Sequence, residues 1–212
     1  MSKMQEISEL VQKGRSKEIV GVVQSAIDNG EKPNEIINDG LLAGMAIVGQ
    51  KFKNEEIFVP EVLIAARAMN KGIEVLKPYL QDNGNVSKGK IVLGTVKGDL
   101  HDIGKNLVRI MMEGKGIEVI DLGTDVSAET FIEEAKNNNV DIICCSALLT
   151  TTMPEMEKVV QLVKNNHLDF KIMIGGAPVN QEFCDQIGAD YYTADAATAA
   201  DVASQIIGGK SC

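Results

Sequence analysis

Hydrophobic residues up to about position 80 recur at the spacing of one face of an α-helix. This spacing predicts four amphipathic helices joined by short loops, which is typical of a small bundle. Asn29-Gly30 ends the second helix, Pro33 suits the first turn of the third, and Asp39-Gly40 is a point where the third can kink. The residues that define the four helices are Ile7, Leu10 and Val11; Ile19, Val22, Val23, Ala26 and Ile27; Ile36, Ile37, Leu41, Leu42, Met45, Val48 and Phe52; and the segment from Phe58 to Leu80.

Beyond this region the pattern changes to short apolar runs that alternate with helical segments. The stretch 81–89 between the two patterns is polar and rich in turn-forming residues, so we expect a linker there. The expected domains are a helical domain over 1–84 and a second domain over 85–212. The alternation predicts an α/β domain with a five-stranded parallel sheet covered on both faces. We expect its strands at 91–96, 117–122, 140–146, 170–174 and 190–193, and a last helix over 195–207.

The charge balance excludes some classes of partner. The formal net charge is -9 at pH 7 and no basic stripe is visible, so we expect no nucleic-acid partner. The first ten residues lack the apolar segment of a secretory signal, and no run approaches the roughly 18 apolar residues that cross a bilayer. We therefore expect a cytoplasmic protein that has no membrane partner.

The four cysteines form no Cys-x-x-Cys pair. Cys144 and Cys145 lie within an apolar run, and free cysteine is usually buried, so we interpret them as residues of a buried strand. A redox or zinc role is the alternative.

The segment that carries most chemical information is Asp99-Leu100-His101-Asp102-Ile103-Gly104-Lys105-Asn106, directly after the first expected strand. A histidine preceded by a carboxylate can offer one ring nitrogen to a metal while the carboxylate accepts a hydrogen bond from the other. Ligands of parallel sheets bind outside the carboxyl ends of the strands. The segments Ser146–Thr152 and Gly175-Gly176 follow two further strands, so three candidate segments are expected at one edge of the sheet.

A nucleotide-binding loop does not fit this segment. Asp99 stands where a P-loop has its first glycine, and Asn106 stands where it has Ser or Thr. A structural histidine that bonds a nearby carbonyl is the alternative for His101. No second His or Cys lies nearby, so a metal bound here must bring most of its own ligands, as a macrocycle does. His167 lies in a polar run and is expected to be solvated.

The motifs Asp99-x-His101-x-x-Gly104, Ser146-x-Leu148 and Gly175-Gly176 resemble the cobalamin-binding signature of methyltransferase-system corrinoid proteins, which is similar to the cobalamin-binding module of methionine synthase. The helical half resembles the cap domain of this family. The residues that carry this second likeness are Gly44-Met45, Val48-Gly49, Phe52, Phe58-Val59-Pro60-Glu61-Val62 and Ala65-Ala66-x-Ala68-Met69. The resemblance implies a four-helix cap followed by a flavodoxin-like, Rossmann-like domain.

The resemblance also implies a cofactor and the residues that hold it. The cofactor is cobalamin in its base-off/His-on form, with His101 as the lower ligand of cobalt. Asp99 would orient the imidazole, and Thr152 would extend a proton relay in which the family usually has serine. The further residues expected at the cofactor are Asp102, Ile103, Gly104, Ser146, Leu148, Thr150, Gly175 and Gly176, with Phe58 and Met69 from the cap.

Some of these residues have structural alternatives. Asp102 is equally suited to be the N-cap of the following helix. Ser146 and Thr150 are alternatively capping residues at a strand end. Gly175 and Gly176 are alternatively a tight turn.

The function implied is that of a methyl carrier, in which cobalt cycles between Co(I) and methyl-Co(III). Such a chain is not a complete enzyme. Its expected partners are a substrate methyltransferase, an acceptor methyltransferase that uses coenzyme M or tetrahydrofolate, and a reductive activase. The methyl donor would be a methylamine, a quaternary amine, methanol or a methoxyaromatic, and overall likeness favours the amines.

Three other classes are the alternatives. A cobalamin-dependent mutase small subunit normally lacks a helical cap. A cobalamin-sensing regulator would add a basic DNA-binding segment. A flavodoxin-like interaction domain without cofactor would leave Asp99 and His101 unexplained at a strand end.

Overall fold

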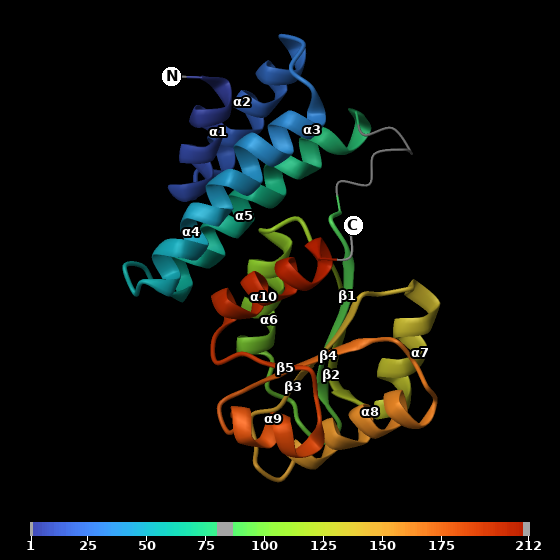
Figure 1. Ribbon diagram of the computed structural model, residues 1–212. Helices are drawn as coiled ribbons and strands as arrows, with labels where there is room; N and C mark the ends of the chain where they lie inside the picture. The colour runs from blue at the N-terminus through green and yellow to red at the C-terminus, as the bar shows by residue number, and fades with distance from the viewer. Residues whose placement is uncertain (1, 80–86, 210–212) are drawn as a thin grey trace. The chain divides into compact units, whose positions relative to one another are not determined.

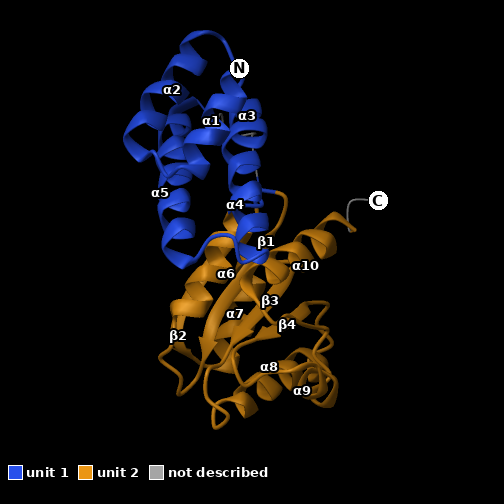
Figure 2. Ribbon diagram, turned by 90° about the vertical axis from the view of Figure 1, so that its left-hand side faces the viewer, with its two compact units in different colours: residues 1–87, 114–116 blue, residues 88–113, 117–212 orange. Residues whose placement is uncertain are grey.

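A computed structural model describes residues 2–79 and 87–209. The chain divides into two compact units, residues 1–87 with 114–116 and residues 88–113 with 117–212 (Figure 2). The expected boundary between residues 84 and 85 lies outside the described residues. Within the described ranges, no helix combines the length and apolar character that a membrane span needs.

The first unit is built from the four expected helices. Ser2 and Gln5 form a capping box at the start of α1, and the Glu61 carboxylate accepts the Phe58 amide at the start of α5 (3.0 Å). The buried faces carry the apolar residues that the spacing indicated, including Ile7, Ile19 and Leu41. The elements are α1 (Lys3–Gln12), α2 (Ser16–Asp28), α3 (Pro33–Glu35), η1 (Ile36–Leu42), α4 (Ala43–Lys53), α5 (Val59–Leu76) and η2 (Lys77–Tyr79).

Two details of this unit differ from the expectation. The third helix is helical from Pro33 to Lys53, but its middle part η1 is a π-helix, which includes Asp39-Gly40, where the sequence allowed a kink. The fourth helix ends at Leu76 instead of Leu80 and passes into the short 3₁₀ turn η2. Pro78 lies in that turn and explains the early end, because proline has no amide hydrogen with which to continue the hydrogen bonds of the helix. Leu80 lies outside the described residues.

The second unit contains the expected five-stranded parallel sheet, with the strand order β2-β1-β3-β4-β5. Strand β2 is longer than predicted, because it continues past residue 122 through two irregular steps in its pairing with β1. The elements are β1 (Lys90–Val96), α6 (Ile103–Glu113), β2 (Glu118–Val126), α7 (Ala128–Asn138), β3 (Ile142–Ser146), α8 (Met153–Asn165), β4 (Lys171–Gly175), α9 (Gln181–Ile187), β5 (Tyr191–Tyr192) and α10 (Ala196–Gly208).

Helices cover both faces of this sheet (Figure 1). Helices α7, α8 and α9 share one hydrophobic core with the strands, whereas α6 and α10 pack against each other on the opposite side. Cys144 and Cys145 are free and buried within β3, as expected. Burial raises the pKa of the Cys144 thiol to about 12, so this thiol stays protonated at neutral pH.

Candidate functional site

The three candidate segments lie together at the carboxyl edge of the sheet. In the strand register, Thr95 of β1 pairs with Ser146 of β3, and Ser146 pairs with Gly175 of β4. The loops that leave these three neighbouring strands therefore begin side by side. The expectation that the segments meet at one edge is confirmed.

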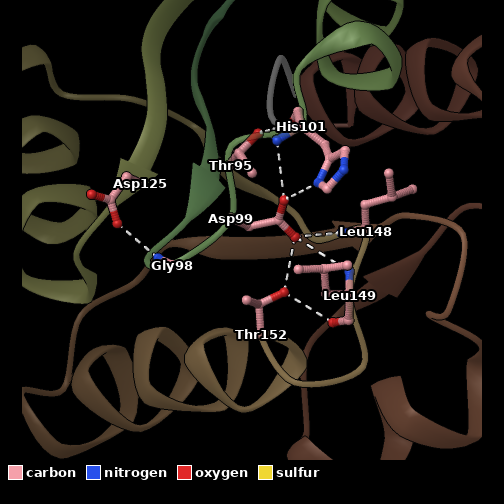
Figure 3. A network of polar contacts seen from close by, with 8 residues as sticks. All are labelled: Thr95, Gly98, Asp99, His101, Asp125, Leu148, Leu149 and Thr152. Atoms are coloured by element: carbon pink, nitrogen blue, oxygen red, sulfur yellow. Dashed lines mark hydrogen bonds and ion pairs between the residues drawn. The ribbon is translucent and has the colours of Figure 1, made fainter.

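The centre of the site is the carboxylate of Asp99, which is completely buried. Its Oδ1 lies 2.7 Å from Nδ1 of His101 and also accepts the His101 amide (3.1 Å). Its Oδ2 accepts the amides of Leu148 (2.7 Å) and Leu149 (3.3 Å) and the hydroxyl of Thr152 (2.9 Å), as Figure 3 shows. One carboxylate thus connects the β1–α6 loop with the β3–α8 loop.

Asp99 is a carboxylate rather than a carboxylic acid at neutral pH. Burial by itself raises the pKa of this group, because it disfavours the charged form. The hydrogen bonds from Leu148, His101 and Thr152 outweigh that effect and hold the pKa of Asp99 well below its usual range. The site therefore contains a buried negative charge that only accepts hydrogen bonds.

This charge determines which nitrogen of His101 carries the proton. An ionised carboxylate cannot donate, so the 2.7 Å contact requires a proton on Nδ1. In a neutral imidazole the lone pair is then on Nε2. The His101 side chain is 51% exposed whereas Asp99 is fully buried. His101 thus presents a basic nitrogen outside the sheet edge, in the tautomer that suits a metal ligand.

Thr152 lies at the N-cap position of α8, but its side chain makes no capping hydrogen bond there. Its hydroxyl lies 2.9 Å from Asp99 Oδ2 and 2.9 Å from the Leu149 carbonyl. A hydroxyl has one proton, so it donates to either acceptor at a given moment. This geometry agrees with the predicted place of Thr152 beside Asp99; the relay itself remains a prediction.

Large apolar side chains are exposed close to His101. Leu148 and Leu149 donate their amides to Asp99, while Leu100 and Ile103 flank His101 in the sequence. Exposed apolar surface of this kind marks a binding site more often than single scattered residues do. The exposed fractions are 73% for Leu100, 80% for Ile103, 43% for Leu148 and 40% for Leu149.

Three further polar residues that were expected at the cofactor lie in or beside these loops. Asp102 directly precedes α6, its carbonyl accepts the Asn106 amide (2.8 Å), and its carboxylate accepts the Asn106 side chain (3.0 Å). This is the N-cap position that was the alternative for Asp102. Thr150 is exposed in the β3–α8 loop, and Ser146 is half-buried at the end of β3.

The two residues of the helical half that were predicted at the cofactor differ in their exposure to solvent. Phe58 is 67% exposed, whereas Met69 is 1% exposed and packs in the core of the first unit. Met69 therefore offers no surface to a ligand in this structure, which does not support the contact expected for it. Met69 lies on the apolar face of a helix, as an ordinary core residue does, and this position explains its burial.

Residues outside the three sequence motifs also contact the loop that carries His101 or the helix that follows it. Thr95 donates its hydroxyl to the His101 carbonyl (2.8 Å), and Asp125 accepts the Gly98 amide (2.7 Å). Lys105, which is 3% exposed, forms an ion pair with Asp121. Thr95 could have been noticed as a buried polar residue at a strand end. Asp125 gave no local signal, because it lies beyond the expected end of its strand.

No cluster of three or more His, Cys, Asp or Glu side chains is arranged for a metal ion among residues 2–79 and 87–209. A metal bound at His101 would therefore find no ready set of further protein ligands in the described part of the chain.

Comparison with known proteins identifies the class. Residues 89–203 match a family model described as a B12 binding domain, and residues 4–77 match a second model with the same description. The chain therefore belongs to the B12-binding domain family.

Relatives extend this likeness over nearly the whole chain. A corrinoid protein of Desulfitobacterium hafniense is 39% identical over 213 residues, covering 98% of this chain and 99% of that protein. Dimethylamine corrinoid protein 1 of Methanosarcina acetivorans is 43% identical over 208 residues, covering 96% and 97%. A chain of the methanol:cobalamin methyltransferase complex MtaBC from Methanosarcina barkeri has a TM-score of 0.91 and 33% identity, covering 98% and 80%. The protein is thus similar throughout to corrinoid proteins of methyltransferase systems.

The residues at the sheet edge fit a bound cobalamin. A corrin is a flat macrocycle with largely apolar faces and a rim of methyl groups and amide side chains, and the site offers a basic nitrogen among exposed apolar side chains. At Gly104, in the first turn of α6, an added Cβ would meet no heavy atom within 4 Å, so there is free space at this position. Gly176 differs, because its φ is +137° and an added Cβ would lie 1.8 Å from the Ala147 carbonyl oxygen. The fold alone therefore requires Gly176, as in the tight-turn alternative.

This contrast predicts opposite effects of two alanine substitutions. Gly104→Ala is expected to keep the cofactor-free protein as stable as wild type or raise its stability by up to about 1 kcal/mol, because alanine favours α6. The added methyl would nevertheless reduce cobalamin retention. Gly176→Ala is expected to destabilise the fold by more than about 2 kcal/mol through the clash and the unfavourable φ. Thermal unfolding of both cofactor-free variants checks the pair, and a larger loss for Gly104→Ala would contradict it.

Proposed function

We propose that this protein carries a methyl group on a bound cobalamin between two methyltransferases. The observation that carries the proposal is the buried Asp99 carboxylate, which fixes the His101 tautomer so that Nε2 is available outside the sheet edge. When bound, the corrinoid supplies a cobalt that accepts a methyl group in its reduced state and releases it to a nucleophile.

His101 is proposed as the lower ligand of cobalt in a base-off/His-on arrangement. Asp99 keeps the proton on Nδ1 and makes the imidazole a better donor, because a negative partner increases the basicity of the ring. An imidazole that is not bound to a metal could take up a proton on Nε2, and the Asp99 carboxylate would stabilise the resulting cation. Thr152 is placed to adjust its hydrogen bond as that charge changes.

The cofactor's own nucleotide base must then be bound elsewhere. We propose the edge formed by Ser146 and Gly175, which are adjacent in the register of β3 and β4. Ser146 is half-buried and can donate its hydroxyl to the nucleotide arm. Gly175 lacks a side chain that would narrow the space beside it.

The partners proposed are a substrate methyltransferase, an acceptor methyltransferase that uses coenzyme M or tetrahydrofolate, and a reductive activase. The names of the relatives support the first of these, and the dimethylamine relative favours a methylamine or a quaternary amine as the methyl donor. The family match over residues 4–77 supports a carrier with a helical domain over a mutase small subunit, which normally lacks one.

Reconstitution tests the proposal. The protein, loaded with hydroxocobalamin under reducing, oxygen-free conditions and then desalted, is expected to retain cobalamin and to change its absorption spectrum reversibly on reduction. Addition of iodomethane to the reduced protein should give the spectrum of a methylated corrinoid, with iodide as the leaving group. The His167→Ala variant is the matched control and should behave as wild type. A folded protein that retains no cobalamin would refute the proposal.

A further inference from the structure

Strand β2 contains two irregularities opposite the end of β1. Leu93 pairs with Asp121 but the next residue, Gly94, pairs with Gly123, and Val96 pairs with Val126. In each of these two steps β2 uses one more residue than β1. Such bulges re-aim side chains and occur often beside functional sites.

The second bulge places Asp125 against the loop that carries the histidine. Asp125 has a φ of +57°, in the left-handed region that a residue other than glycine adopts only occasionally. Its amide donates to the Asp99 carbonyl (3.0 Å), and its Oδ1 accepts the Gly98 amide (2.7 Å). Figure 3 shows the side chain of Asp125 pointing at Gly98. Asp125 therefore bonds to two successive residues of the β1–α6 loop.

The two bonds from Asp125 fix the backbone beside the Asp99 carboxylate, which contacts His101. The Asp99 carboxylate is fixed on one side by Leu148, Leu149 and Thr152, which belong to the β3–α8 loop. The Asp99 backbone is fixed on the other side by Asp125. The side chain of Asp125 thus bonds to residue 98, and its amide bonds to residue 99. With the carboxylate and the backbone both held, the His101 imidazole stays at the 2.7 Å distance that selects its tautomer.

We propose that Asp125 is a positioning residue for His101, acting through the Gly98–Asp99 backbone. Its importance for cobalt ligation rests on the proposed function, but its effect on the histidine tautomer does not. Two features of β2 support the role: the bulge that adds a residue before Val126, and the left-handed backbone that turns the carboxylate toward Gly98. Neither feature is needed to continue the pairing of β2 with β1.

The test measures the His101 tautomer in the cofactor-free protein. Protein labelled with ¹⁵N-histidine reports by its ring nitrogen shifts which nitrogen of the imidazole carries the proton. The His167→Ala background leaves one histidine signal, that of His101. In this background the Nδ1–H form is expected to dominate. Asp125→Ala should shift the population toward Nε2–H, the form that imidazole prefers in water.

Three further variants separate positioning from general damage. Asp125→Asn keeps an oxygen that accepts the Gly98 amide and should retain the Nδ1–H form. Asp125→Gly tolerates the positive φ and removes only the carboxylate, so it should shift the tautomer even if the alanine variant does not fold. Asn139→Ala places alanine at another left-handed position, with φ +50°, at the end of α7, and should leave the tautomer unchanged.

The result that overturns the proposal is an unchanged tautomer in Asp125→Gly, or an equal shift in Asn139→Ala. Loading with cobalamin then gives an independent readout. The Co(II) form of Asp125→Gly should show a smaller fraction of histidine-ligated cobalt by electron paramagnetic resonance than Asp125→Asn shows. If wild type binds no cobalamin while the tautomer still depends on Asp125, the proposed function fails and the positioning role stands.

Discussion

His101→Ala is expected to abolish the nitrogen ligation of cobalt from below. No other imidazole can replace it. The chain has one further histidine, His167, and this residue lies after helix α8, not after the carboxyl end of a strand. The apolar side chains around the site remain, so His101→Ala should still bind cobalamin. We expect its affinity for cobalamin to be about ten to a hundred times lower than that of wild type, which is the usual effect of damage around a metal ligand. The absorption spectrum should become that of base-off cobalamin without a nitrogen ligand.

The measurement is electron paramagnetic resonance of the protein in its Co(II) form. In wild type the cobalt lines should be split by a single ¹⁴N nucleus into triplets, and ¹⁵N-histidine should convert the triplets to doublets. His101→Ala should show no splitting, while His167→Ala keeps it. Persistence of the splitting in His101→Ala, unaltered by ¹⁵N-histidine, would mean that the cofactor's own base binds cobalt, and the ligand assignment would be wrong.

Asp99→Asn is expected to have the second largest effect, on both stability and ligation. The carboxylate accepts five hydrogen bonds, three at Oδ2 and two at Oδ1. An asparagine presents an NH₂ group to one of these two sets of donors, whichever way it is turned. A buried donor then faces other donors, and we expect a loss of about 3 kcal/mol in the free energy of unfolding.

The same substitution should alter the histidine. If the amide NH₂ faces His101, it donates to Nδ1, and the ring proton moves to Nε2, which can then no longer bind a metal. Asp99→Asn should therefore reduce the histidine-ligated fraction in the Co(II) spectrum as well as the stability. Asp102→Asn is the matched control, because it makes the same chemical change at an exposed position of the same loop. It should leave both quantities close to wild type.

The contribution of Asp99 to stability should depend on pH in a defined direction. Its pKa in the folded protein is depressed below the ordinary value of 3.8, so the unfolded chain binds this proton more readily. The stabilisation is therefore fully present above that ordinary value and is lost as the pH falls through the lower, folded-state value. The difference in unfolding free energy between wild type and Asp99→Asn should be constant near neutral pH and shrink in acid. Denaturant titrations at several pH values check this, and a difference that grows in acid would contradict it.

The elements of the fold were predictable because their signals are local. Helical spacing identified the four helices, and apolar runs identified five strands, since both patterns arise from which side of an element is buried. The residues at which helices and strands end were less predictable. The early end of α5 follows from Pro78, a local signal, but the extension of β2 to Val126 arises from bulges against β1 that have no signature in β2 itself.

The residues at the centre of the candidate site were predictable from the sequence, but a residue that contacts the histidine loop from another strand was not. Asp99, His101 and Thr152 were identified by their place in motifs, and the structure brings them into one hydrogen-bonded group. Met69 was expected at the cofactor because it lies in a matching segment, but a buried helix face explains it better. Asp125 was not identified, because its role exists only where β2 and the β1–α6 loop meet.

The order of residues along the chain determined which chemical groups are present and which strand ends they follow. It determined an imidazole two positions after a carboxylate, and glycines where strands end. The tertiary structure alone decided that the carboxylate is buried, that five donors from two loops converge on it, and that the imidazole remains exposed. The physical reason is that burial and hydrogen bonding of Asp99 depend on residues some fifty positions away, which approach only when β1 and β3 pair.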